Sequence, residues 1–277
     1  TGKHIGIIGR ESMNELTIKV YDADGSEIAA ATDDEYVHLV LSDAAYGEGF
    51  CIRMDVTEAG QFYMVKIDET LEEALLYFKE NTWVYQIPCG EKKEAYCPQA
   101  FTGNVHFLSL RKAEEHEWNR YRNLAKNPLD QQEAGGCFPH VSANTETRGE
   151  AVFAARNVID GICANRFHGI WPYQSWGINR QKDAALTLDF GIPMDIDRID
   201  LWTRADFPHD SWWDNVTFIF SDGSEECITL EKKWKPHHLK LARWGITWIK
   251  MCNMHRGSEE SPFPALTQIE VYGIPAK

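Results

Sequence analysis

Two segments in the second half of the chain combine aromatic rings with polar side chains at spacings that fit neither a helix nor a strand. Residues 168–177 form the stretch "HGIWPYQSWG", and residues 204–214 form "RADFPHDSWWD". The flat face of a Trp or Tyr ring can stack on an apolar ligand face while its polar edge stays in water. The guanidinium of arginine and the oxygens of carboxylates can hold neighbouring hydroxyl groups. Both segments therefore predict a loop site for a small, hydroxyl-rich ligand such as a sugar.

The candidate ligand-binding residues are the rings and polar side chains of these two loops. Adjacent residues of an extended chain point to opposite faces, so one of Trp212 and Trp213 is expected in the core. The structural alternative is that the rings close the end of a hydrophobic core and that the polar groups form a salt-bridged turn. The full set is His168, Trp171, Tyr173, Trp176, Arg204, Asp206, His209, Asp210, Trp212 and Trp213.

The elements that must position these loops are short runs in which apolar and polar residues alternate. In the first 110 residues, runs such as "LTIKVY", "EYVHLVL" and "TWVYQIP" follow one another with turn residues between them. The second half contains similar runs, among them "AALTLDFG", "NVTFIFSDGS" and "LTQIEVYG". Regularly spaced strands without long helices between them are typical of a β-sandwich or barrel. We therefore expect an all-β fold in both halves.

One helix is expected, within residues 111–127, because Trp118, Tyr121 and Leu124 recur at three-residue steps. The Asn-Pro pair at 127–128 should end it. The resulting prediction is two jelly-roll-like β-sandwich domains joined by a short helix. The predicted boundaries are 1–110 for an N-terminal sandwich of unknown role, 111–136 for the helix and linker, and 137–277 for the second sandwich.

Charge and composition restrict the partners. The formal net charge is −14, with 43% hydrophobic and 25% charged residues, which is the composition of a folded globular chain. An acidic chain does not suit the phosphates of nucleic acid or an anionic membrane surface, so we expect neither as a partner. The first residues carry no long apolar segment of the kind found in signal peptides. Whether a leader was removed before residue 1 is left open.

Cysteine usage favours a cytoplasmic location. The chain has seven cysteines, an odd number, and none forms a C-x-x-C pair of the kind found in zinc sites. Reduced, buried thiols are the expectation, and a bridge between Cys89 and Cys97 across a hairpin is the alternative.

Four stretches of the second half, in order, carry a resemblance to a known family. They are "ARNVIDG" (155–161), "AALTLDFG" (184–191), "IDRIDLWTRAD" (196–206) and "LTQIEVYG" (266–273). In this order they resemble landmarks of the discoidin-like modules, also called coagulation-factor (F5/8) type C domains, and of their galactose-binding-like carbohydrate-binding relatives. The resemblance covers residues 137–273 and does not extend to the first half.

The resemblance implies a jelly-roll sandwich whose loops at one end bind a ligand without catalysis. That ligand is a sugar in many members and a phospholipid or protein in others. No cofactor is required, and calcium is the one metal that the resemblance suggests. Asp160 matches a calcium ligand of the relatives, whereas Gln268 stands where they have an acidic residue. A neutral side chain weakens a site for a hard cation.

We therefore expect a carbohydrate-binding protein that is not an enzyme, with its site on the loops of the second sandwich. The first alternative is a glycan-acting hydrolase or lyase with an interdomain site. It would use a carboxyl pair such as Asp206 with Asp210, or Glu259 with Glu260. The second alternative is a protein–protein interaction module in which the aromatic loops form a buried patch. The particular sugar, the role of the N-terminal domain and the oligomeric state are left open.

Overall fold

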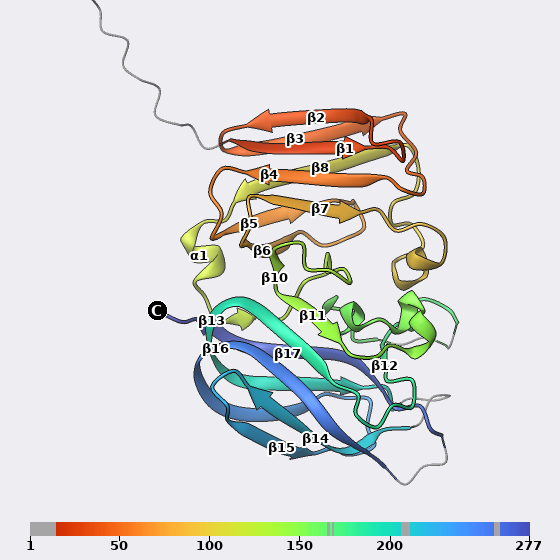
Figure 1. Cartoon of the computed structure of the whole chain (residues 1–277), viewed down its shortest axis with the longest axis vertical. Helices are drawn as coiled ribbons and strands as arrows, with labels where there is room; N and C mark the ends of the chain where they lie inside the picture. The colour runs from red at the N-terminus through yellow and green to blue at the C-terminus, as the bar shows by residue number, and fades with distance from the viewer. Residues whose placement is uncertain (1–14, 165–166, 168, 206–210, 258–260) are drawn as a thin grey trace, which may run out of the picture.

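The computed structural model describes residues 15–164, 167, 169–205, 211–257 and 261–277. These residues form two stacked β-sandwiches, with the N-terminal strands in red to yellow and the C-terminal strands in green to blue (Figure 1). The all-β prediction is confirmed.

The N-terminal sandwich consists of a four-stranded sheet, β2-β1-β4-β7, facing a five-stranded sheet, β10-β6-β5-β8-β3. The alternating runs expected in this half all form strands, because each places its apolar residues on the face between the two sheets. The bounds are β1 Leu16–Tyr21, β2 Glu27–Asp33, β3 Tyr36–Ser42, β4 Cys51–Val56, β5 Gln61–Lys66, β6 Ala74–Phe78, β7 Thr82–Gln86, β8 Val105–Lys112 and β10 Cys137–Phe138.

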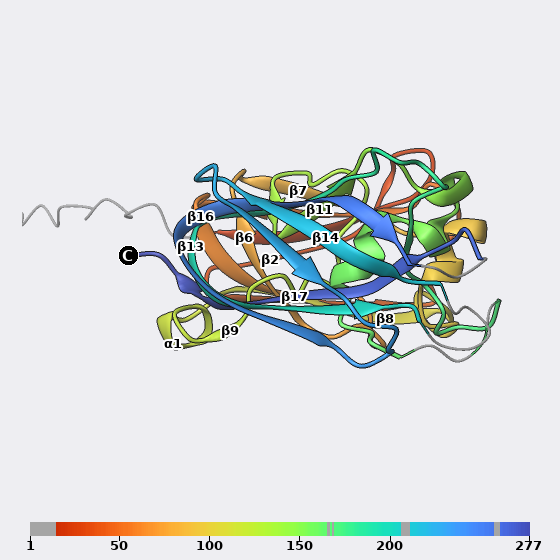
Figure 2. The ribbon, with the colours of Figure 1, turned by 90° about the horizontal axis from the view of Figure 1, so that it is seen from below.

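The C-terminal sandwich is built from a single eight-stranded sheet. The strand order is β12-β17-β13-β16-β14-β15, and β11 pairs with β13 and β9 with β17. Figure 2 shows β13 and β16 curving together near the C-terminus, where their pairing has several register shifts. The bounds are β9 Arg122–Asn123, β11 His140–Ala143, β12 Trp176–Gly177, β13 Leu186–Thr203, β14 Trp213–Phe220, β15 Glu225–Thr229, β16 His237–Arg256 and β17 Ala265–Pro275. The short helices are η1 Gly90–Ala95, α1 Glu115–Trp118, η2 Thr147–Gly149, η3 Ala151–Phe153 and η4 Ala155–Ile159.

The helix expected within residues 111–127 is wrong in extent, because only α1 is helical there. Its start is fixed by a capping box between Glu114 and Glu117. The chain then leaves the helix, since Arg122 and Asn123 pair with the edge of β17 and the side-chain amide oxygen of Asn123 accepts from the Val271 N–H. Pairing with a distant strand thus outweighs the local helical pattern.

The chain crosses from one sandwich to the other at Pro139. The preceding residues, Cys137–Phe138, pair with β6, whereas His140–Ala143 pair with β13. Gly191, the glycine of the "DFG" landmark, lies directly under this crossing. It has a φ of +75°, and a Cβ built on it would lie 2.6 Å from the Phe138 ring. Packing therefore explains the glycine of this landmark, because a larger residue would collide with Phe138.

Buried polar side chains join the two sandwiches. Arg156 donates to the carbonyl oxygens of Asp130 (2.8 Å) and Pro128 (2.9 Å), and its guanidinium lies 4.4 Å from the centre of the Tyr96 ring. The Asp130 carboxylate contacts Nδ1 of His140 at 2.8 Å and accepts from the Val141 N–H at 3.0 Å. Burial disfavours the charged imidazole, but Asp130 outweighs that effect and raises the pKa of His140. This cluster is satisfied by its own neighbours, as expected of a structural contact.

All seven cysteines lie in the described part of the chain and are free, so the Cys89–Cys97 bridge does not form here. Only Cys137 and Cys252 are buried, and Cys227 is exposed, so the expected burial holds for two of the seven. Among the described residues, no helix has the length and apolar character needed to cross a membrane.

Candidate functional site

A pocket opens at the end of the C-terminal sandwich where β12 pairs with the start of β17. Its volume is about 370 Å³, near the lower end of the range for small-molecule sites. Three separate turns supply its walls, around residues 147–148, 177–180 and 263–265. The lining residues are Thr147, Arg148, Phe153, Gly177, Ile178, Asn179, Arg180, Phe263, Pro264 and Ala265.

The wall of the pocket is held in place by a buried threonine. Oγ1 of Thr147 accepts from the Asn179 N–H at 3.0 Å, which ties the first turn to the second. Arg148, Asn179 and Arg180 all have positive φ angles, of 55°, 49° and 59°. Such backbone conformations cost non-glycine residues about 1–3 kcal/mol each and concentrate at ligand sites. Three of them around one opening mark it as a candidate functional site.

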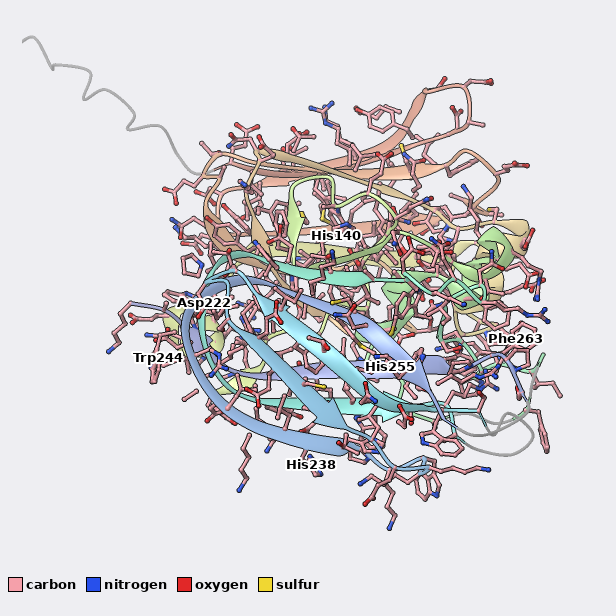
Figure 3. The ribbon with its side chains drawn as sticks, turned by 60° about the horizontal axis from the view of Figure 1, so that its bottom comes forward. His140, Asp222, His238, Trp244, His255 and Phe263 are labelled. Carbon is pink, nitrogen blue, oxygen red and sulfur yellow. The ribbon has the colours of Figure 1, made fainter. Side chains whose placement is uncertain are left out.

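The exposed face of the pocket is a pair formed by Arg180 and Phe263. The guanidinium lies 4.3 Å from the centre of the ring, and Phe263 is 37% exposed. Arg180 makes no ion pair with any other described residue, so its N–H groups are available to a ligand. Figure 3 shows Phe263 at the end of the molecule opposite Trp244. The guanidinium covers one face of the ring, so a planar set of donors and a partly exposed apolar ring lie in contact at the opening.

Arg148 lies on the other side of the opening and is already engaged. Nη2 donates to Oε2 of Glu150 at 2.7 Å, and Nε donates to the other carboxylate oxygen. Its guanidinium also lies 5.4 Å from the centre of the Phe153 ring. Two arginines line the pocket, and Arg148 is paired with Glu150. Arg180 is therefore the pocket arginine without an acidic partner among the described residues.

Two of the candidate tryptophans are in the core. Trp176 and Trp213 are both 0% exposed, and their ring centres lie 6.4 Å apart. Nε1 of Trp176 donates to the Thr145 carbonyl oxygen at 2.9 Å, so even its polar edge is used internally. For Trp176 this corrects the expectation of stacking on a ligand, because the ring has no exposed face, whereas Trp213 is the core member expected of the 212/213 pair.

Arg204 and Tyr173 are also turned inward. Arg204 is 1% exposed, and its Nη1 donates to the carbonyl oxygen of Tyr173, which is itself buried. The Arg204 N–H donates to the carbonyl oxygen of Ala265, a pocket-lining residue, at 2.9 Å. The two loops therefore do lie side by side, but this arginine joins them and does not face the opening. That is a second correction to the expected site.

The other expected residues fall into two groups. Trp171 and Trp212 are half-buried, and Trp212 lies against Gly257 and 5.4 Å from Nζ of Lys232. A ligand contact from either ring stays a prediction. His168, Asp206, His209 and Asp210 lie outside the described residues, as do Glu259 and Glu260.

The surroundings of Asp160 do not fit a calcium ion. Its oxygens accept from the Ile162 N–H at 2.8 Å and from the side-chain amide of Gln174 at 3.0 Å. The Gln174 oxygen in turn accepts from the Tyr173 N–H. Burial raises the pKa of Asp160 to about 6. A carboxylate held by N–H donors in this way stabilises the loop, and we derive no metal chemistry from it.

Sequence reasoning missed the side chains that the loops do expose. Phe167 and Ile170 are each 53% exposed, whereas Tyr173 and Trp176 are buried. Arg180 and Phe263 were also missed. The available signal was the aromatic residue of "SPFPAL", which stands between two prolines and so cannot belong to a regular strand interior.

No protein-family model matches the chain, and no curated protein matches it significantly. The chain is similar to a chitosan-binding module of a Paenibacillus sp. IK-5 chitosanase/glucanase, at 18% identity over 56% of this chain and 100% of the module, with a TM-score of 0.38. It is also similar to the lectin domain of lectinolysin complexed with Lewis B antigen (14% identity, 54% and 95% coverage, TM-score 0.40). A third similar structure is a Streptococcus pneumoniae fucose-binding module (12% identity, 55% and 97% coverage, TM-score 0.39).

Proposed function

We propose that the protein binds carbohydrate, without catalysing a reaction, in the pocket at the end of the C-terminal sandwich. The observation that carries the proposal is the exposed stack of Arg180 on Phe263. A sugar ring has an apolar face of C–H groups that fits on the part of the Phe263 ring that Arg180 leaves exposed, and a rim of hydroxyls that fits the Arg180 donors. The pocket also lies beside the start of the "LTQIEVYG" landmark, at the loop end where the resemblance expects a ligand.

Affinity should be modest. The pocket presents one exposed aromatic face, and burying it is worth about 1–2 kcal/mol at about 25 cal/mol per Å². Hydrogen bonds to sugar hydroxyls replace bonds to water and add about 1 kcal/mol each. We expect dissociation constants in the range of about 10 μM to 1 mM for a single sugar unit.

A glycan array with the full chain tests the proposal. Binding to a defined group of glycans is expected, and it should be lost in Arg180→Ala. A matched control is Lys235→Ala, which removes a cation beside the exposed Trp234 and does not line the pocket. Absence of binding to every glycan, or equal binding by the two variants, would overturn the proposal.

Two further assays separate the alternatives. Release of a chromophore from aryl glycosides by the wild-type chain would show catalysis. A tight dimer in sedimentation that dissociates on Phe167→Ala would favour protein interaction, because Phe167 is an exposed ring directly before the aromatic loop 168–177.

A further inference from the structure

His106 is a buried polar side chain without a hydrogen-bond partner in the described part of the chain, and it lies in the N-terminal sandwich, far in sequence from the proposed sugar site. It occupies a core-facing position of β8, in alternation with the buried Leu108 and Leu110. The residue is 0% exposed, and neither ring nitrogen has a hydrogen-bond partner among the described residues. Most buried polar groups are satisfied, and an exception indicates a missing ion or water.

The strand register brings two carboxylates to this histidine. β5 and β8 are antiparallel neighbours in one sheet (Figure 1), and their pairing ends with Lys66 opposite Ser109, so residues 67–69 leave β5 beside the start of β8. Glu69 accepts from the Phe107 N–H, which fixes this arrangement. One carboxylate oxygen each of Asp68 and Glu69 and one nitrogen of His106 lie within 4.8 Å of one another.

Both carboxylates are held in place but lack a positive partner. Oδ1 of Asp68 accepts from the N–H and the hydroxyl of Thr70, and Oδ2 accepts from the Phe101 N–H at 2.6 Å. These bonds orient Asp68 and leave lone pairs on Oδ2. No ion pair joins Asp68 or Glu69 to a basic residue in the described part of the chain. Two adjacent carboxylates beside a buried imidazole therefore form a site for a cation.

Access and shape fit a bound ion. Asp68 is buried, whereas Glu69 is exposed and opens the cluster to solvent. The Tyr46 ring covers His106 on one side, with centres 3.9 Å apart and planes at 18°. Ligand atoms of a tetrahedral ion with bonds of about 2.0–2.2 Å lie about 3.3–3.6 Å apart. The three atoms lie within 4.8 Å of one another, so binding requires the side chains, including that of the exposed Glu69, to move closer together.

We propose that Asp68, Glu69 and His106 bind a divalent transition-metal ion of the zinc class. The imidazole nitrogen selects against Mg²⁺ and Ca²⁺, which prefer oxygen ligands, and suits Zn²⁺, Co²⁺ or Ni²⁺. Three protein ligands leave the remaining coordination positions to water. The site lies in the N-terminal sandwich and is independent of the sugar pocket.

Calorimetric titration of the chelator-treated full chain with Zn²⁺ tests the site, with Co²⁺ absorption as a second readout of coordination by imidazole. One ion per chain is expected. His106→Leu should abolish binding and Glu69→Gln should weaken it at least about tenfold. The matched controls, His116→Ala and Glu48→Gln, alter exposed residues outside the cluster and should leave binding unchanged.

Stability gives a second readout. Zn²⁺ should raise the unfolding temperature of the wild type but not of His106→Leu. If His106→Leu fails to fold, Glu69→Gln decides, because that side chain is exposed. Absence of Zn²⁺ and Co²⁺ binding by the wild type would overturn the proposal, as would equal binding by Glu69→Gln and Glu48→Gln. A water bound by His106 would then be the explanation.

Discussion

Two groups of arginine and aromatic side chains lie at the same end of the C-terminal sandwich, and they differ in exposure. Arg204 lies with Tyr173 and Trp176 in the interior, where the guanidinium donates to a backbone carbonyl. Arg180 lies on Phe263 at the mouth of a pocket and has no acidic partner among the described residues. The comparison teaches that residue type does not separate a structural cluster from a binding cluster. The exposure of the side chains does.

The largest expected effect concerns the buried group. Trp213→Ala should lower the free energy of unfolding by about 3–5 kcal/mol, because it leaves a large cavity in the core. Trp212→Ala, at the adjacent half-buried position, should cost less than half of that. Urea denaturation of both variants checks the pair. Equal losses would mean that the two rings do not differ in burial.

The next effect is the pH dependence set by Asp160. Burial raises its pKa to about 6 from a usual value of 3.8, so the folded state binds the proton more tightly than the unfolded state. Its contribution to stability is therefore largest at low pH and is lost as the pH rises from about 4 to 6. Between pH 4 and 7 the free energy of unfolding of the wild type should fall by on the order of 2 kcal/mol more than that of Asp160→Asn. Parallel pH profiles of the two proteins would contradict this environment for Asp160.

A smaller effect is expected at the exposed group. Phe263→Ala should weaken glycan binding by about tenfold, or about 1.4 kcal/mol, because it removes the stacking surface. Its free energy of unfolding should fall by less than about 1 kcal/mol, since the ring is partly exposed. Trp244→Ala, at the exposed ring at the other end of the molecule, is the control (Figure 3). If Trp244→Ala weakens binding and Phe263→Ala does not, the glycan site lies at the Trp244 end of the molecule and the account is contradicted.

The smallest effect tests the link between the two turns of the pocket. Thr147→Val keeps the shape of the side chain but removes the oxygen that accepts from the Asn179 N–H. Thermal unfolding should show a loss of about 1 kcal/mol. Glycan affinity should fall as well, because Asn179 and Arg180 would no longer be held in their left-handed conformations. An unchanged affinity would show that this link does not shape the pocket.

The strands could be predicted from the sequence because alternation of apolar and polar residues is a local signal. The end of α1 could not, since the pairing of Arg122 and Asn123 with β17 depends on residues far along the chain. The convergence of the two loops followed from the family landmarks. The sequence did not predict which side chains face outward. A loop has no fixed period that would distinguish the buried Trp176 from the exposed Phe167.

The pocket itself was beyond sequence reasoning for a similar reason. Its walls come from three turns between residues 147 and 265, so no single stretch carries the pattern. The left-handed backbone at Arg148 and Arg180 gives no signal either, because arginine is not a residue type that favours it. His106 was overlooked because one histidine in an apolar strand predicts only a core position.

The most direct test is a crystal structure of the full chain with the glycan that binds most tightly on the array. We predict a sugar ring lying against Phe263, with a hydroxyl or carboxylate oxygen within hydrogen-bond distance of the Arg180 guanidinium. A sugar bound elsewhere on the chain, with the Arg180–Phe263 pocket empty, would contradict the account.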